Sequence, residues 1–210
     1  MSARGRFISF EGGEGAGKTT QLGRLLEYLA ARDVPVVATR EPGGTEVGEA
    51  IRAILLDKTL PAMQGDTEAL LMYAARVEHV ATLIRPALAA GQWVVSDRFA
   101  DASHVYQGAG RGLGDARLSA LEQWCLGDFQ PDLTILLDVP VEVGMERVRQ
   151  RGEKDRFEEE DRAFFQRVRE AYLARAARYP ARFLVIDASQ DTDRVSRQIE
   201  AKVAQWLSQP

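Results

Sequence analysis

Cysteine, histidine and long apolar runs are scarce in this chain of 210 residues, which holds one cysteine, Cys125, and two histidines, His79 and His104. A single cysteine excludes an internal disulfide, and two histidines add little toward a metal site. We expect Cys125 to be a buried, inert thiol. No apolar run approaches the roughly 20 residues that cross a bilayer, and the first residues lack the apolar segment of a signal peptide. We therefore expect a cytoplasmic protein that makes no contact with a membrane.

An excess of positive charge is also missing. The chain has 27 Lys and Arg against 31 Asp and Glu, a formal net charge of −4, and the two signs are interspersed. No broad positive field is available to bind nucleic acid, so the expected partners are small anions met by local arginines. The hydrophobic content of 45% suffices for the core of one domain over residues 1–210.

Five apolar runs bounded by turn residues alternate with amphipathic stretches. The runs are RFISFE (6–11), VPVVATR (34–40), QWVVSDR (92–98), DLTILLDV (132–139) and RFLVID (182–187). Helical periodicity marks the stretches between them, for example 21–33 and 67–90. The alternation predicts an α/β fold, with a five-stranded parallel sheet and helices on both faces. In such folds ligands bind at the carboxyl ends of the strands.

The most specific motif is GGEGAGKT, residues 12–19, which fits GxxxxGK[ST] and lies between a predicted strand and a predicted helix. Backbone N–H groups of such a loop cradle phosphate oxygens, while Lys18 reaches the β- and γ-phosphates and the Thr19 hydroxyl ligates Mg²⁺. The motif therefore predicts a nucleoside triphosphate site. The residues expected around the triphosphate are Gly12, Gly13, Gly15, Ala16, Gly17, Lys18, Thr19 and Thr20.

Two strand ends suggest a second anion site. REPGGT, residues 40–45, follows the second run, and Arg52 comes one helical segment later. This loop is either an anion-binding turn, in which Glu41 and Pro42 lie near a ligand that Arg52 pairs with, or an ordinary turn. The third run ends in Asp97-Arg98, where Asp97 can hold Mg²⁺ through water and Arg98 can clamp an acceptor phosphate.

Asp138 and Asp187 also end predicted strands, but neither has an arginine beside it. We interpret them as cap or turn residues.

Helical spacing groups several candidates for binding a nucleoside. Met72 and Arg76 share one face of a helix, and Arg76 is either a snorkelling surface residue, which is the commoner case, or a reader of a base edge. Ser103, Tyr106 and Gln107 lie within about one turn and could offer a ring and polar groups to a nucleoside. His104 is more typical of a surface histidine than of a base, because phosphoryl transfer depends on positioning and electrostatics.

Residues 149–162, RQRGEKDRFEEEDR, are nearly all charged. Taken alone, the segment is typical of a solvated helix-loop-helix surface.

Together, FEGGEGAGKTTQ, REPGGT, LLMYAAR, SDRFADASHVYQGAGRG, PDLTILLDV and RGEKDRFE resemble the bacterial thymidylate kinases over nearly the whole chain. The resemblance implies a P-loop NTPase fold, a single nucleoside monophosphate kinase domain, transfer of the γ-phosphoryl group of MgATP to dTMP, and a homodimer. It also implies roles for individual residues: Glu14 at the 3′-hydroxyl of dTMP, Arg52 and Arg98 at its phosphate, Arg76 at the thymine carbonyl edge, Ser103 and Gln107 near the base, Tyr106 at the 2′ position and Asp97 near the metal.

The resemblance also assigns a role to the charged segment. Some members of the family carry an arginine in the phosphate loop where this chain has Gly15, and the bacterial subtype supplies a catalytic arginine from a short mobile lid instead. The lid would be about 149–162, with Arg149, Arg151 and Arg156 as candidates and Arg151 as the first choice, while Arg147 is expected on the helix surface.

The chain departs from the family where a phenylalanine usually stacks on thymine. Met72 takes that position and Tyr73 follows it. Either methionine packs on the base, or another aromatic residue covers it.

Two rival functions remain open: a kinase for another nucleoside monophosphate or a deoxynucleoside, and a P-loop switch that hydrolyses slowly. An arginine donor at Arg76 suits the O4 acceptor of thymine and is mismatched with the amino group of cytosine. A guanine-reading switch would carry Asn-Lys-x-Asp, which the sequence lacks.

Overall fold

The computed structural model describes residues 4–152, 157 and 160–207, with the backbone alone at Arg151. Five parallel strands form a sheet in the order β2-β3-β1-β4-β5. The strands are β1 (Phe7–Glu11), β2 (Val36–Arg40), β3 (Trp93–Asp97), β4 (Leu133–Asp138) and β5 (Phe183–Asp187). In the central strand, Ser9 lies opposite Ser96 of β3 on one side and Thr134 of β4 on the other. The predicted α/β architecture is confirmed.

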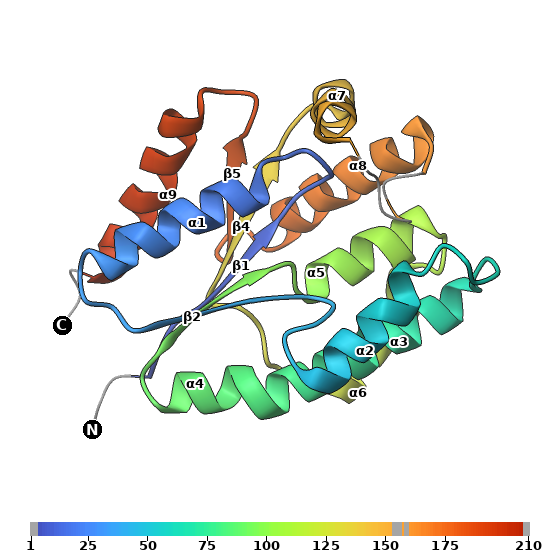
Figure 1. Cartoon of the computed structure of the whole chain (residues 1–210), viewed down its shortest axis with the longest axis horizontal. Helices are drawn as coiled ribbons and strands as arrows, with labels where there is room; N and C mark the ends of the chain where they lie inside the picture. The colour runs from blue at the N-terminus through green and yellow to red at the C-terminus, as the bar shows by residue number, and fades with distance from the viewer. Residues whose placement is uncertain (1–3, 153–156, 158–159, 208–210) are drawn as a thin grey trace.

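The described residues form the helices α1 (Lys18–Ala30), α2 (Glu46–Leu56), α3 (Gly65–His79), α4 (Arg85–Ala89), α5 (Ala100–Ser103), α6 (Asp115–Leu126), α7 (Val141–Arg151), α8 (Arg162–Arg178) and α9 (Thr192–Leu207), with π-helical segments η1 (Val80–Ile84) and η2 (His104–Gly110). None of these helices has both the length and the apolar character needed to cross a bilayer. In Figure 1, α1 and α9 lie on one side of the sheet and α3 to α6 on the other.

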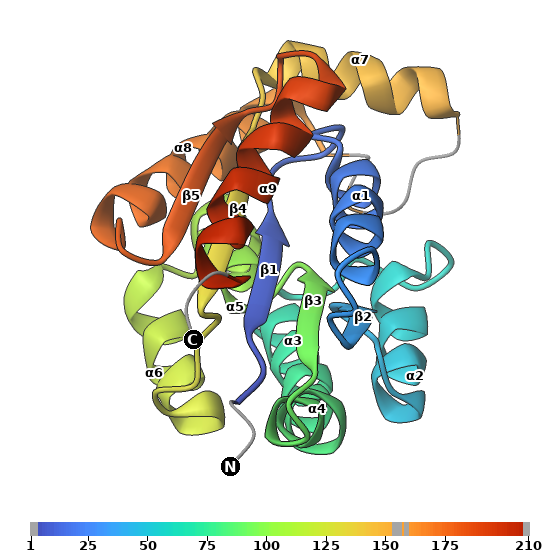
Figure 2. The ribbon, with the colours of Figure 1, turned by 90° about the vertical axis from the view of Figure 1, so that its left-hand side faces the viewer.

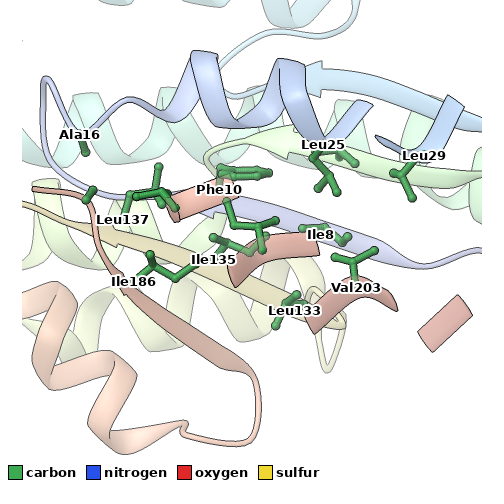
Figure 3. Close-up of a cluster of buried hydrophobic side chains, with 14 of the residues drawn as sticks. Ile8, Phe10, Ala16, Leu25, Leu29, Leu133, Ile135, Leu137, Ile186 and Val203 are labelled. Atoms are coloured by element: carbon green, nitrogen blue, oxygen red, sulfur yellow. The ribbon is translucent and has the colours of Figure 1, made fainter. Parts of the chain in front are cut away.

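Alternation along the strands builds a core on each face, because successive side chains of a strand point to opposite sides. Ile8 and Phe10 pack under α1 and α9, where Leu25 and Leu29 of α1 point toward them (Figure 3). Phe7, the neighbour of Ile8, instead packs against η1 and α4. The sheet is thus buried on both faces.

The predicted helix over 67–90 is present, but it contains a π-helical turn. Helix α3 continues through η1 into α4, and Pro86 lies in the first turn of α4. Proline has no N–H to donate and its ring clashes with the carbonyl four residues earlier, so the backbone widens into a π turn just before it. The whole segment still covers one face of the sheet.

Candidate active site

The carboxyl ends of β1, β2 and β3 border a cavity of about 660 Å³. The phosphate loop that follows β1 lies at this end of the sheet, beside α7 (Figure 2). Residues from distant parts of the sequence line the cavity, and those among them that the sequence predicted are Glu14, Gly15, Ala16, Gly17, Lys18, Thr19, Thr20, Glu41, Pro42, Arg52, Met72, Arg76, Asp97, Arg98, Ser103, Tyr106 and Gln107. Most of the predicted site residues therefore meet in one cavity.

Lys18 is hydrogen-bonded to the backbone of the phosphate loop itself. The Lys18 ammonium donates hydrogen bonds to the carbonyls of Gly12 at 3.1 Å and Gly13 at 3.0 Å. These two glycines, which the sequence placed around the triphosphate, are not among the residues that line the cavity. Burial lowers the pKa of Lys18, and the nearby charge of Arg98 lowers it further. Gly17 has a left-handed φ of 87° and leads into α1, whose first N–H groups form an anion site at the cavity.

Gly15 is the point where α7 packs onto the phosphate loop. Its φ is 70°, and a Cβ at this position would lie 2.2 Å from the carbonyl oxygen of Gly144 in α7. The present packing therefore leaves no room for a side chain at position 15.

Arg147 is exposed on α7, as the sequence predicts for a helix-surface residue, and it also contacts the phosphate loop. One turn beyond Gly144, its guanidinium donates to the carbonyls of Gly15 and Ala188, both at 3.2 Å, and it lines the cavity. The signal in the sequence was its spacing of three residues from Gly144, which places both residues on one helix face.

Only some of the candidate lid arginines lie within the described residues. Arg149 is exposed and pairs with Glu146 at 2.7 Å, Arg151 ends α7, and Arg156 lies outside the described residues. Phe157, inside the predicted lid, is buried and lines the cavity. Its ring meets Tyr106 edge to face, with 6.3 Å between the centroids. This segment therefore contributes an aromatic side chain to the cavity.

Arg98 follows β3 with a left-handed φ of 71° and is held from several sides. Its guanidinium forms an ion pair with Glu14, and it donates to the hydroxyls of Tyr106 at 3.0 Å and Tyr172 at 3.3 Å and to the Gly12 carbonyl at 3.2 Å. Burial disfavours the charge, but the neighbouring Tyr106 and Glu14 raise the pKa of Arg98 well above its usual value. A permanent cation thus lies beside the phosphate loop.

Asp97 and Thr19 fit a magnesium ion. The Oδ1 atom of Asp97 is buried and has no hydrogen-bond partner among the described residues, and both side chains line the cavity. Buried polar atoms are almost always paired, so a carboxylate oxygen left without a partner suits a water-coordinated cation. Mg²⁺ usually needs only one or two protein ligands besides substrate phosphates.

Arg76 is buried in the pocket, so its interpretation as a snorkelling residue is wrong. It is 2% exposed, and its Nε donates to Glu41 at 2.6 Å, Nη1 to Ser103 at 3.1 Å and Nη2 to the Phe99 carbonyl at 3.2 Å. Glu41 is itself bonded to His79 at 2.9 Å. The buried carboxylate fixes the direction of the guanidinium.

Three other residues that the sequence singled out do not line the cavity. Tyr73, expected near the substrate, is not among the lining residues and packs with Ala69 and Leu118, because it lies one position, about 100° of helix, beyond Met72. His104 is buried against Asp115 and Glu122, so the expectation of a surface histidine is wrong. Cys125 was expected to be buried but is only half-buried, and burial raises the pKa of its thiol.

The fold and the cavity define a P-loop protein in which Arg52, Arg76 and Arg98 line the same cavity as the phosphate loop. The family model described as thymidylate kinase matches residues 10–199. Relatives named thymidylate kinase include one from Alkalilimnicola ehrlichii, 55% identical with 98% of this chain and 97% of the relative covered, and one from Vesicomyosocius okutanii, 54% identical with 94% and 96% covered. A third, from Alcanivorax borkumensis, is 53% identical over 98% of this chain and 99% of its own length. The chain belongs to the thymidylate kinase family.

Proposed function

We propose that this protein is a dTMP kinase, which transfers the γ-phosphoryl group of MgATP to dTMP and gives dTDP and ADP for dTTP synthesis. The observation that carries the proposal is that the phosphate loop and the buried, carboxylate-held Arg76 line the same cavity. A hydrolase or a switch needs a site for the triphosphate and a water, whereas a kinase needs a second pocket for an acceptor.

On the donor side, Lys18 would exchange its two loop carbonyls for the β- and γ-phosphates of ATP, and the N-terminus of α1 would bind the phosphate oxygens. Thr19 and Asp97 would hold Mg²⁺, Asp97 through water. When bound there, the ion would supply positive charge that offsets the negative charge developing on the phosphates. Arg147 adds a cation on the ATP side of the cavity, next to Gly15.

On the acceptor side, Arg98 and Arg52 would bind the phosphate of dTMP, and Glu14 its 3′-hydroxyl. Arg98 is at present paired with Glu14, so the acceptor phosphate would share a cation that is already in place. Arg52 donates to the Pro42 carbonyl at 2.9 Å, which holds it over the loop after β2. No general base is needed, because a phosphate monoester is already an anion near neutral pH, and alignment with the γ-phosphorus lowers the barrier.

The lid would complete the site. We assign one nucleoside monophosphate kinase domain to residues 1–210 and the lid to about 149–162, with a catalytic arginine among Arg149, Arg151 and Arg156. Its closure would exclude water, which otherwise hydrolyses ATP without transfer. Phe157 supports the assignment, because it belongs to this segment and lines the cavity.

The thymine would lie between Arg76 and η2, near Ser103 and Gln107, with Met72 against the ring. Met72 lines the cavity and is 9% exposed. Tyr106 would crowd the 2′ position and favour deoxyribose.

We also propose a cytoplasmic homodimer. Two neighbouring helices present apolar side chains spaced by seven residues, which places each pair on one helix face. These are Val47 and Ile54 of α2 and Leu70 and Val77 of α3, each at least 40% exposed. Such a surface suits burial against a second copy.

The test is ADP release in a coupled assay with MgATP, comparing dTMP, dUMP, ribose-containing TMP, CMP and thymidine with a control that lacks an acceptor. Strong turnover with dTMP and a low background is the expected result. Equal ADP release with and without acceptors would refute the kinase function and favour an ATPase or a switch.

A further inference from the structure

Gln107 donates a hydrogen bond to a buried carboxylate, just as Arg76 does to Glu41. Gln107 of η2 lines the cavity and is 1% exposed, and its Nε2 donates to the Oε1 atom of Glu68 at 2.8 Å. Glu68 comes from α3, is also 1% exposed, and is not among the residues that line the cavity. Arg111 supplies countercharge, with its Nε 3.5 Å from the same carboxylate oxygen.

This contact determines which way the Gln107 amide points. A carboxylate only accepts hydrogen bonds, so the NH₂ group of the amide must face Glu68. The flipped amide would set its carbonyl oxygen against the carboxylate in a buried site and remove the 2.8 Å hydrogen bond, which costs more than an ordinary hydrogen bond contributes. No described residue donates a hydrogen bond to the Gln107 carbonyl oxygen, and because Gln107 lines the cavity, this oxygen is the atom left to a ligand.

We propose that Glu68 is a positioning residue that presents the Gln107 carbonyl to the N3–H group of a pyrimidine, and so selects thymine and uracil against cytosine. The inference rests on the proposed function. Thymine offers an O4 acceptor beside its N3–H donor, whereas cytosine offers an amino donor beside an N3 acceptor. Arg76 donates and Gln107 accepts, so the pair matches the thymine edge and opposes both groups of cytosine.

The test combines an isosteric variant with two altered substrates. Glu68→Gln keeps the shape of the side chain, but its amide can either donate or accept, so the Gln107 orientation is no longer dictated. The substrates are dTMP, its N3-methyl analogue, in which a methyl group replaces the N3 hydrogen and both carbonyls are kept, and dCMP. For each, kcat, KM and the dissociation constant by calorimetry are measured on the whole protein. Glu122→Gln is the matched control, because it removes another buried glutamate of the same fold that does not line the cavity.

In the wild type, the N3-methyl analogue should bind at least roughly tenfold more weakly than dTMP, because it lacks the donor of one buried hydrogen bond. In Glu68→Gln that penalty should shrink, because dTMP no longer meets a fixed acceptor, and the preference for dTMP over dCMP should fall by about tenfold, through KM rather than kcat. Glu122→Gln should keep both wild-type ratios.

Unchanged ratios in folded Glu68→Gln would overturn the proposal, since a residue that only supports the fold would weaken all three substrates alike. Equal binding of dTMP and the N3-methyl analogue to the wild type would overturn it without any variant. Absence of turnover would refute the proposed function instead, while the calorimetric ratios would still decide the role of Glu68.

Discussion

Glu11, at the end of β1, is a buried carboxylate whose titration should be visible in the stability of the fold. It is 0% exposed; its Oε1 accepts from the Phe99 N–H and its Oε2 from the Tyr172 hydroxyl, both at 2.7 Å. Burial raises the pKa of Glu11 to about 7, and the charge of Asp101 adds to the effect. The charge of Arg98 and the two hydrogen bonds act in the opposite direction without cancelling it.

The sign follows from proton linkage. The folded state holds the Glu11 proton more tightly than the unfolded chain, whose pKa is near the ordinary value of 4.5. The stabilisation is therefore fully present below pH 4.5 and is lost as the pH rises to about 7. At about 1.4 kcal/mol per pH unit, this interval corresponds to about 3 kcal/mol of unfolding free energy.

Glu11→Gln should remove this dependence, because the amide can donate to Tyr172 and accept from Phe99 as the protonated acid would. Urea unfolding between pH 4 and pH 8 measures the free energy of unfolding of both proteins. The variant should gain stability relative to wild type as the pH rises, by about 3 kcal/mol in all.

Glu122→Gln provides a control of opposite sign. Burial tends to raise the pKa of Glu122, but the bonds from His104 outweigh it and lower the pKa below its ordinary value. This variant should therefore lose stability relative to wild type as the pH rises through the acid range. A stability difference between Glu11→Gln and wild type that stays constant across the pH range would refute the assignment of a raised pKa to Glu11.

Three further predictions follow from the cavity and its supports. Arg98→Ala should lower kcat with dTMP by at least about a hundredfold while circular dichroism shows a folded protein, because the acceptor phosphate loses a fixed cation; retained turnover would remove Arg98 from the mechanism. Tyr106→Ala should improve kcat/KM for ribose-containing TMP relative to dTMP, and an unchanged ratio would place the reading of the 2′ position elsewhere. Gly110→Ala should lower stability by about 1–3 kcal/mol in thermal unfolding, because its Cβ would lie 2.6 Å from the buried Phe164 ring, whereas Gly108→Ala, with 3.8 Å to its nearest neighbour, should be tolerated.

The parts of the site that lie close together in the chain could be predicted from the sequence. The phosphate loop needs only a strand, a turn of glycines and a helix in succession, so its residues specify their own geometry. Asp97 and Arg98 could also be predicted to lie at the same edge of the sheet as this loop, because the carboxyl ends of parallel strands lie at one edge.

Contacts between distant segments could not be predicted in the same way. Asp138 has no arginine beside it in sequence, but α8 brings Arg169 to it in a two-pronged ion pair, at 2.7 and 2.9 Å. The interpretation of Asp138 as only a cap or turn residue was therefore incomplete. Asp187, in contrast, bonds to the backbone of Ser189 as a turn residue should.

The alternation of strands and helices, the phosphate loop and the family could be read from the sequence, because these depend on local spacing and on residue types. The partners of three polar side chains depend on the packed fold: Glu41 for the buried Arg76, Glu68 for the buried Gln107, and the Gly15 carbonyl for the exposed Arg147. Each pairing joins segments between 35 and 132 residues apart. Such segments meet only when the sheet and its helices pack, and the need to satisfy every buried polar group then selects the pairs.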